Sequence, residues 1–269
     1  MRFKRIYVEL SNMCNLNCSF CSNDKREKRA LTIEEFEYIL NQIKKYTNLI
    51  YLHIKGEPLL YKKIEQVFEL CKKNNIKIKI TTNGIYLNKY INTINKYDNI
   101  VQINISLMCE NNDNNYLDKI IETSSKIKTT IVYRVWLINK KSSNLILEKI
   151  LKYYKKENIG KNIKLNDHIY LDKDIEFTWP NKGKTKTPNG ICYGTRTHIG
   201  ILSNGEVVPC CLDSEGELSF GNIFKNNIEE ILNSSKFITF NDKIKKGIMP
   251  SELCQKCDFK KRLNKQSVW

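Results

Sequence analysis

Three cysteines lie close together near the N-terminus and could bind a metal cluster. They are Cys14, Cys18 and Cys21, in the spacing C-x-x-x-C-x-x-C. Three thiolates in one loop can hold three irons of a [4Fe-4S] cubane and leave the fourth iron open to a ligand, whereas structural zinc needs four ligands. The spacing therefore favours an iron–sulfur cluster with one open position, and zinc is the alternative.

Four further cysteines could close a second metal site downstream. They are Cys192 and Cys210, followed by the C-x-x-C of Cys254 and Cys257. Four thiols are enough for a fully ligated second cluster, and also for a zinc knuckle, so both interpretations stay open. The isolated Cys71 and Cys109 are interpreted as small core or pocket residues.

The elements that must position these cysteines alternate between strands and helices. From residue 5 to about 166, β-branched runs alternate with amphipathic stretches, which is typical of βα units around a parallel sheet. The predicted strands are 5–11, 49–55, 76–82, 100–108, 129–138 and 161–165. The predicted helices are 33–46, with Thr32 as its cap, 62–73, 87–96, 116–125 and 143–157. An incomplete βα barrel or a doubly wound sheet fits this order, and both folds carry their chemistry at the C-terminal ends of the strands.

The composition changes near residue 178. Residues 179–183 and 188–190 are rich in turn formers and lack periodicity, so a linker is expected there. We therefore predict one domain over 1–177 and a second over 178–269. In the second, an Asn-Gly turn predicts a β-hairpin over 198–210, and residues 227–233 are predicted to form a short helix.

Charge and composition exclude several classes of protein. The formal net charge is +16, but most of the basic residues are Lys spread along the chain, whereas recognition of phosphates and bases favours Arg, so nucleic acid is not expected as a partner. No apolar run reaches the length of about 18 residues that a membrane span requires. Ten cysteines without an export signal indicate a reducing compartment, and a cytoplasmic location is expected.

The first cysteine motif, with Phe20 just before its third Cys, resembles the hallmark of the radical S-adenosylmethionine (SAM) superfamily. The resemblance implies that Cys14, Cys18 and Cys21 hold a [4Fe-4S] cluster whose open iron binds SAM. The Gly56-Glu57-Pro58 segment is similar to the family's Gly-Gly-Glu-Pro, which meets the SAM amino group, with Lys55 in place of the first Gly. The SAM-binding residues implied by the resemblance are Phe20, Gly56, Glu57, Pro58, Thr82, Asn83, Ser106 and Arg134.

The downstream cysteines resemble the auxiliary domains of the SPASM and twitch group. Full SPASM domains carry more Cys after the C-x-x-C and bind two auxiliary clusters, and none follows here. The resemblance therefore implies the single-cluster twitch form, with one auxiliary [4Fe-4S] cluster on Cys192, Cys210, Cys254 and Cys257, as in aminocyclitol dehydrogenases of the butirosin pathway. The fold class that it implies is α/β, a partial (β/α)6 radical SAM barrel with a small C-terminal twitch subdomain.

The resemblance also implies the chemistry of an enzyme. The reduced cluster cleaves SAM to a 5′-deoxyadenosyl radical, which abstracts a hydrogen atom from a substrate. One expected reaction is oxidation of a hydroxyl on a sugar or aminocyclitol-like small molecule, with the auxiliary cluster as electron acceptor. The alternative is maturation of a ribosomal peptide by epimerisation or crosslinking, and a non-enzymatic iron–sulfur scaffold is a third hypothesis.

Two further expectations follow for the partners. Because the barrel motif begins at residue 14, no room is expected for an N-terminal leader-binding domain, which favours the small-molecule substrate over the peptide. A reducing partner such as flavodoxin or ferredoxin is implied.

Two residues beside the auxiliary ligands are candidates for the catalytic step. An epimerase needs a thiol that returns a hydrogen atom, and Cys211 is the spare cysteine best placed for it. A dehydrogenase needs a proton acceptor, for which Asp213 is the candidate carboxylate. The structural alternatives are a small buried residue for Cys211 and a solvated turn residue for Asp213.

Overall fold

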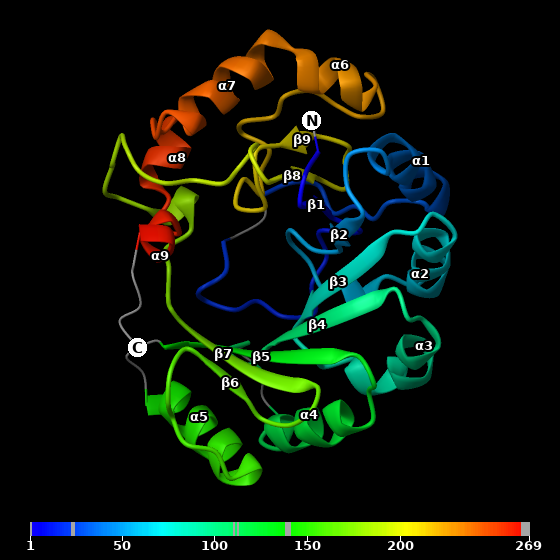
Figure 1. Ribbon diagram of the computed structural model, residues 1–269, viewed down its shortest axis with the longest axis vertical. Coiled ribbons are helices and arrows are strands. Elements are labelled where there is room, and N and C mark those ends of the chain that lie inside the picture. The colour runs from blue at the N-terminus through cyan, green and yellow to red at the C-terminus, as the bar shows by residue number, and fades with distance from the viewer. Residues whose placement is uncertain (1, 23–24, 110, 112, 138–140, 265–269) are drawn as a thin grey trace.

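The computed structural model describes residues 2–22, 25–109, 111, 113–137 and 141–264. Within these residues, nine strands form a single sheet in the order β6-β7-β5-β4-β3-β2-β1-β8-β9. The strands are β1 (Arg5–Val8), β2 (Leu49–Tyr51), β3 (Lys77–Thr82), β4 (Ile100–Ser106), β5 (Thr130–Leu137), β6 (Asn162–Lys164), β7 (Ile169–Ile175), β8 (His198–Ile201) and β9 (Val207–Val208). Figure 1 shows the sheet curved into an open barrel.

Seven of the described strands run parallel, and six of them follow one another around the barrel. β1 to β5 are neighbours in chain order, and β7 lies parallel beside β5. This arrangement confirms the α/β class and the partial barrel. The predicted strand at 161–165 does not, however, take the sixth place in the barrel: β6 pairs antiparallel with β7, which occupies that place. Ile138, the predicted end of the fifth strand, lies outside the described residues.

The helices between the strands pack on the outer face of the sheet (Figure 1). They are α1 (Ile33–Ile43), α2 (Ile64–Lys73), α3 (Ile91–Lys96), α4 (Tyr116–Ser125) and α5 (Lys141–Tyr154), with short 3-10 turns η1 (Pro58–Leu60), η2 (Leu87–Tyr90) and η3 (Pro180–Lys182). The predicted cap is confirmed, because Thr32 and Glu35 form a reciprocal capping box at the start of α1.

One fully buried isoleucine from each of seven strands fills the layer between the sheet and the helices. These residues are Ile6, Ile50, Ile78, Ile103, Ile131, Ile169 and Ile199. Side chains alternate between the two faces of a strand, so the neighbouring positions point into the barrel. There Tyr7 and Tyr51, which are paired in register, place their ring centroids 5.0 Å apart. The inner face of the barrel is therefore partly polar.

The C-terminal region joins the same sheet. β8 pairs in parallel with β1, and β9 returns antiparallel to β8, which confirms the predicted hairpin. Helices α6 (Ile228–Asn233), α7 (Ser235–Lys245), α8 (Glu252–Lys256) and α9 (Lys260–Asn264) follow. The division of the chain near residue 178, between β7 and η3, stays a prediction. Among the described residues, no helix has both the length and the apolar character needed to cross a bilayer.

Candidate functional site

The three N-terminal cysteines share the loop that leaves the C-terminal end of β1. Cys14 is exposed, whereas Cys18 and Cys21 are half-buried, and the Cys21 N–H donates to the Cys18 carbonyl at 3.0 Å. The ten cysteines, all of which are described, form no disulfide. Three thiols on one loop at the end of a barrel strand are a donor set that fits an iron–sulfur cluster.

The segment after β2 holds the start of this loop. The Glu57 N–H donates to the Met13 carbonyl at 2.8 Å. Gly56 has φ +73°, and a Cβ there would lie 2.3 Å from the Ser11 carbonyl oxygen. Any other residue at position 56 would therefore strain the backbone and push the cysteine loop away.

The Glu57 carboxylate connects this segment to the end of β3. It is buried and accepts hydrogen bonds from the Thr82 hydroxyl at 2.6 Å, the Asn83 N–H at 2.8 Å and the Leu59 N–H at 3.0 Å. Burial raises the pKa of Glu57, and these hydrogen bonds act against that rise. Asn83 in turn donates to the Asn15 side chain at 2.9 Å. The segments expected to bind SAM and the cysteine loop are thus in direct contact.

The remaining residues predicted to bind SAM lie on β4, β5, the cysteine loop and η1. Ser106 and Arg134 are partners in the parallel register of β4 and β5. The Arg134 Nε lies 4.0 Å from a carboxylate oxygen of Asp172 on β7, and the Phe20 ring contacts Trp136 with 5.4 Å between centroids. Their roles toward SAM, like that of Pro58 in η1, stay predictions.

The four downstream cysteines line one cavity of about 220 Å³. They are Cys192, Cys210, Cys254 and Cys257. Burial raises the pKa of Cys210, and the neighbouring thiols, Cys211 first and then the three other cysteines of the set, raise it further. Mainly through burial, the pKa of Cys254 rises to about 12 and that of Cys257 to about 11. Because these thiols are hard to deprotonate, they become thiolates only beside the positive charge of a metal.

The local structure brings the C-x-x-C to this cavity. Ser251 caps α8 by accepting from the Cys254 N–H at 3.2 Å, and Cys257 follows the last helical residue. In the described part of the chain, no three His, Cys, Asp or Glu side chains form a group that could hold a metal ion. A cubane is larger than one ion, so its ligands need not converge on a single point. Four thiols around one cavity therefore fit a cluster with four protein ligands.

We expect the anaerobically reconstituted chain to bind about two cubanes, because the two thiol sets are separate. Replacing Cys192 and Cys257 with Ala should remove about half of the iron and leave SAM cleavage measurable. Cys71→Ala is the matched control, since this thiol is fully buried in α2 and should not change the iron content. Elemental analysis that finds one cluster and stoichiometric zinc would show the zinc knuckle instead.

The two candidate catalytic residues border the same cavity. Burial raises the pKa of the Cys211 thiol, while a hydrogen bond with Tyr7 and the charge of Arg5 lower it. Asp213 is 2% exposed, so the alternative of a solvated turn residue is wrong. Its carboxylate accepts from the N–H groups of Glu217 at 3.0 Å and Leu218 at 2.9 Å, and burial raises its pKa to about 6.

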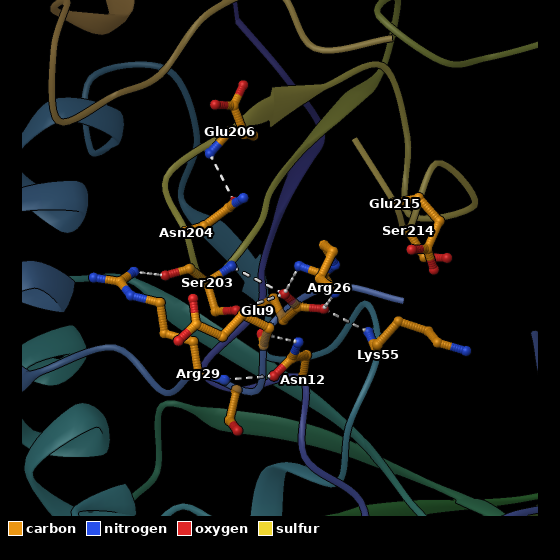
Figure 2. Close-up of polar contacts among 12 residues, drawn as sticks. Glu9, Asn12, Arg26, Arg29, Lys55, Ser203, Asn204, Glu206, Ser214 and Glu215 are labelled. Carbon is orange, nitrogen blue, oxygen red and sulfur yellow. Dashed lines mark hydrogen bonds and ion pairs between the residues drawn. The ribbon is translucent and has the colours of Figure 1, made fainter. Parts of the chain in front are cut away.

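A buried carboxylate that sequence reasoning did not assign joins the two cysteine regions. Glu9, at the end of β1, is fully buried, and its carboxylate accepts hydrogen bonds from both terminal nitrogens of Arg26 at 2.7 and 2.8 Å (Figure 2). It also accepts from the Ser203 N–H and hydroxyl, both at 2.9 Å, and from the Lys55 N–H at 3.0 Å. The available signal was a single Glu interrupting the strand-like alternation of the first residues.

A row of aromatic rings also runs from the cysteine loop to the C-x-x-C. Phe20 contacts Trp136, Trp136 contacts Phe177 at 5.4 Å, and Phe177 contacts Phe259 at 5.3 Å. The Arg262 guanidinium lies 4.7 Å from the Phe177 ring centroid. The sequence contains no local pattern that predicts these contacts, because the rings come from four separate segments.

Comparison with known families identifies the class of protein that this barrel and its cysteine loop define. The family model of the radical SAM superfamily matches residues 8–160, more than half of the chain. The chain therefore belongs to the radical SAM superfamily. The model of the SPASM iron–sulfur cluster-binding domain matches residues 192–258. The protein is thus a radical SAM enzyme. Its cofactors are SAM, a [4Fe-4S] cluster and auxiliary iron–sulfur binding in the SPASM domain.

Curated relatives and solved structures are similar to parts or all of the chain. A probable GTP 3′,8-cyclase of Methanocaldococcus jannaschii is 32% identical over 108 residues, 39% of this chain and 36% of the relative. A GTP 3′,8-cyclase of Synechocystis sp. is 27% identical over 117 residues, 39% of this chain and 34% of the relative. The chain thus spans about a third of the length of the curated relatives that it matches.

Among solved structures, BtrN in complex with AdoMet and 2-DOIA has a TM-score of 0.64 at 20% identity, covering 100% of this chain and 96% of BtrN. Streptococcus suis SuiB bound to its precursor peptide SuiA has a TM-score of 0.57 at 15% identity, covering 99% of this chain and 74% of SuiB. Native anSMEcpe with bound AdoMet has a TM-score of 0.61 at 14% identity, covering 98% and 92%. These likenesses establish a shared fold.

Proposed function

We propose that the chain is a radical SAM oxidoreductase that oxidises a hydroxyl group of a sugar-like or aminocyclitol-like small molecule. The observation that carries this proposal is the composition of the auxiliary cavity. The four downstream thiols share it with Arg5, Tyr7 and His198, which come from β1 and β8 of the barrel sheet. A substrate bound inside the barrel would therefore lie next to an electron acceptor held by those thiols.

In this proposal, Cys14, Cys18 and Cys21 hold the SAM-binding cluster, and Cys192, Cys210, Cys254 and Cys257 hold the auxiliary one. When it is present and reduced, the first cluster would supply the electron that cleaves SAM. The resulting 5′-deoxyadenosyl radical would remove a hydrogen atom from the substrate. Glu57 and Asn83 keep the loop in place through the contacts to Met13 and Asn15. Electrons would reach the first cluster from a flavodoxin or ferredoxin.

The barrel interior beside the cavity has groups that suit hydroxyl recognition. The rings of Tyr7, Tyr51 and His53 contact one another, and His53 Nδ1 is buried without a hydrogen-bond partner among the described residues. Burial together with the charges of Arg134 and Arg5 lowers the pKa of His53 to about 3, so the imidazole is neutral. A neutral imidazole and phenols can exchange hydrogen bonds with the hydroxyl groups of a substrate.

Peptide maturation is the alternative reaction, and the observation behind it is the likeness to SuiB bound to its precursor peptide. The two reactions differ in the fate of the substrate radical. In a dehydrogenase, the substrate radical gives up a proton and an electron to form a carbonyl, and Asp213 is the proposed proton acceptor. In an epimerase, the substrate radical receives a hydrogen atom from a thiol, and Cys211 is the candidate donor.

We expect wild-type protein and Cys211→Ala to convert a hydroxylated small molecule with one SAM consumed per product, and Asp213→Asn to slow turnover. The measurement is mass spectrometry of products formed anaerobically in D2O from a panel of sugars, aminocyclitols, GTP and peptides. A two-hydrogen mass loss without solvent deuterium supports the oxidoreductase. Solvent deuterium in the product, together with a Cys211→Ala variant that forms 5′-deoxyadenosine but no finished product, would decide for the epimerase.

A further inference from the structure

Lys55 is buried against a cysteine of the SAM-cluster loop. It stands where the superfamily motif has its first Gly, and only 7% of the residue is exposed. Its Nζ donates to the Cys21 Sγ at 3.0 Å and to the Ser22 hydroxyl at 2.8 Å, and it also bonds the Ser22 carbonyl. The ammonium thus contacts the sulfur that is proposed to bind iron.

The surroundings fix this ammonium in place. The Lys55 N–H donates to the buried Glu9 carboxylate at 3.0 Å, which anchors the backbone (Figure 2). Nζ lies 5.1 Å from the centroid of the Trp179 ring, within range of a cation–π contact. Ser22 is itself buried, and its hydroxyl lies 3.4 Å from that of Ser214. A buried charge with this many partners keeps one position.

We infer that Lys55 is a positioning residue that raises the reduction potential of the SAM-binding cluster, by donating a charge-assisted hydrogen bond to the Cys21 ligand sulfur. The inference rests on the proposed role of Cys21 as a ligand. Reduction adds one negative charge to the cluster and its sulfurs, so a nearby cation stabilises the reduced form more than the oxidised one. Burial strengthens this effect, because the low local dielectric screens it little.

Lys182 provides a matched comparison on the same loop. Its Nζ donates to the backbone carbonyls of Ser19 at 3.1 Å and Cys21 at 2.6 Å, and neither contact is with sulfur. Lys182 is exposed, so water and salt screen its charge. Replacing either lysine removes one positive charge from the loop, but only Lys55 contacts the ligand atom.

The test is a potentiometric titration, followed by electron paramagnetic resonance, of anaerobically reconstituted Lys55→Met, Lys182→Met and wild-type protein. At a fixed potential, we expect Lys55→Met to lower the ratio of reduced to oxidised SAM-binding cluster about tenfold. This corresponds to a reduction potential that is lower by about 59 mV for one electron. Lys182→Met should change that ratio less than about threefold, because its charge is screened. The auxiliary cluster in the same Lys55→Met sample should keep its potential and serves as an internal control.

Two results would overturn the inference: an unchanged potential in a fully iron-loaded Lys55→Met variant, or an equal shift in Lys182→Met. If Lys55→Met fails to load the first cluster, Lys55→Gln decides instead. It keeps a neutral N–H donor, so its potential should fall below that of wild type, and a wild-type value would overturn the inference. Failure of the ligand assignment itself is distinguishable, because it appears as SAM cleavage in a variant that lacks the three loop cysteines.

Discussion

Replacing Cys14, Cys18 and Cys21 together with Ala is expected to abolish formation of 5′-deoxyadenosine from SAM. The three thiols share one loop at the end of β1, and under the proposed assignment they are the protein ligands of the SAM-binding cluster. The auxiliary thiols line a separate cavity and should keep their cluster. The variant should therefore retain about half of the wild-type iron, measured by elemental analysis beside chromatographic detection of 5′-deoxyadenosine.

Cys109→Ala is the matched control for this triple variant. The Cys109 thiol contacts the Tyr116 hydroxyl at 3.3 Å, and the residue follows β4 at the same end of the barrel, yet it is not in the motif. It should keep both the iron content and SAM cleavage. Formation of 5′-deoxyadenosine at the wild-type rate by the triple variant would refute the assignment of the loop.

Glu9→Ala should lower the free energy of unfolding by about 3 kcal/mol or more, since it removes a fully buried carboxylate together with its two charged hydrogen bonds to Arg26. The Glu9 side chain is fully buried and that of Arg26 is 11% exposed, so water replaces little of the lost interaction. The same change removes the acceptor of the Ser203 N–H and of the Lys55 N–H. The measurement is chemical denaturation of the apoprotein under reducing conditions, followed by circular dichroism.

Glu229→Ala removes a carboxylate of the same kind from the surface. Its ion pair with Lys45 has a similar length, 2.8 Å, but the two side chains are 61% and 60% exposed. Exposed pairs contribute about 0–1 kcal/mol, so this control should be close to wild type. Equal stability losses in the two variants would contradict the role assigned to Glu9.

The local elements of the fold could be predicted well from the sequence. Residues 116–125 were predicted as a helix and form α4 with those bounds, because one face of the segment is apolar at helical spacing. Thr32 was predicted as a cap and is one. The cysteine loop at the end of β1 was also expected, since the motif and the strand are adjacent in sequence.

What the sequence did not predict depends on contacts between distant segments. β7 was not expected as a strand because Asp172 and Asp174 interrupt its apolar residues, yet these carboxylates lie near Arg134 and Lys161. The contact of Lys55 with Cys21 and the hydrogen bonds of Glu9 likewise join residues far apart in the chain. Only the packed structure identifies such partners.

The pairing of β8 with β1 has a consequence for the order of folding on the ribosome. β1 precedes β2 to β7 in the chain, but one of its edges is filled by residues 198–201, which emerge after β2 to β7 have been synthesised. Until then a nascent barrel carries an open edge of unpaired N–H and C=O groups beside the cysteine loop, and such edges favour association with other chains. Prompt arrival of the C-terminal hairpin therefore protects the growing chain from aggregation, in addition to its part in the finished enzyme.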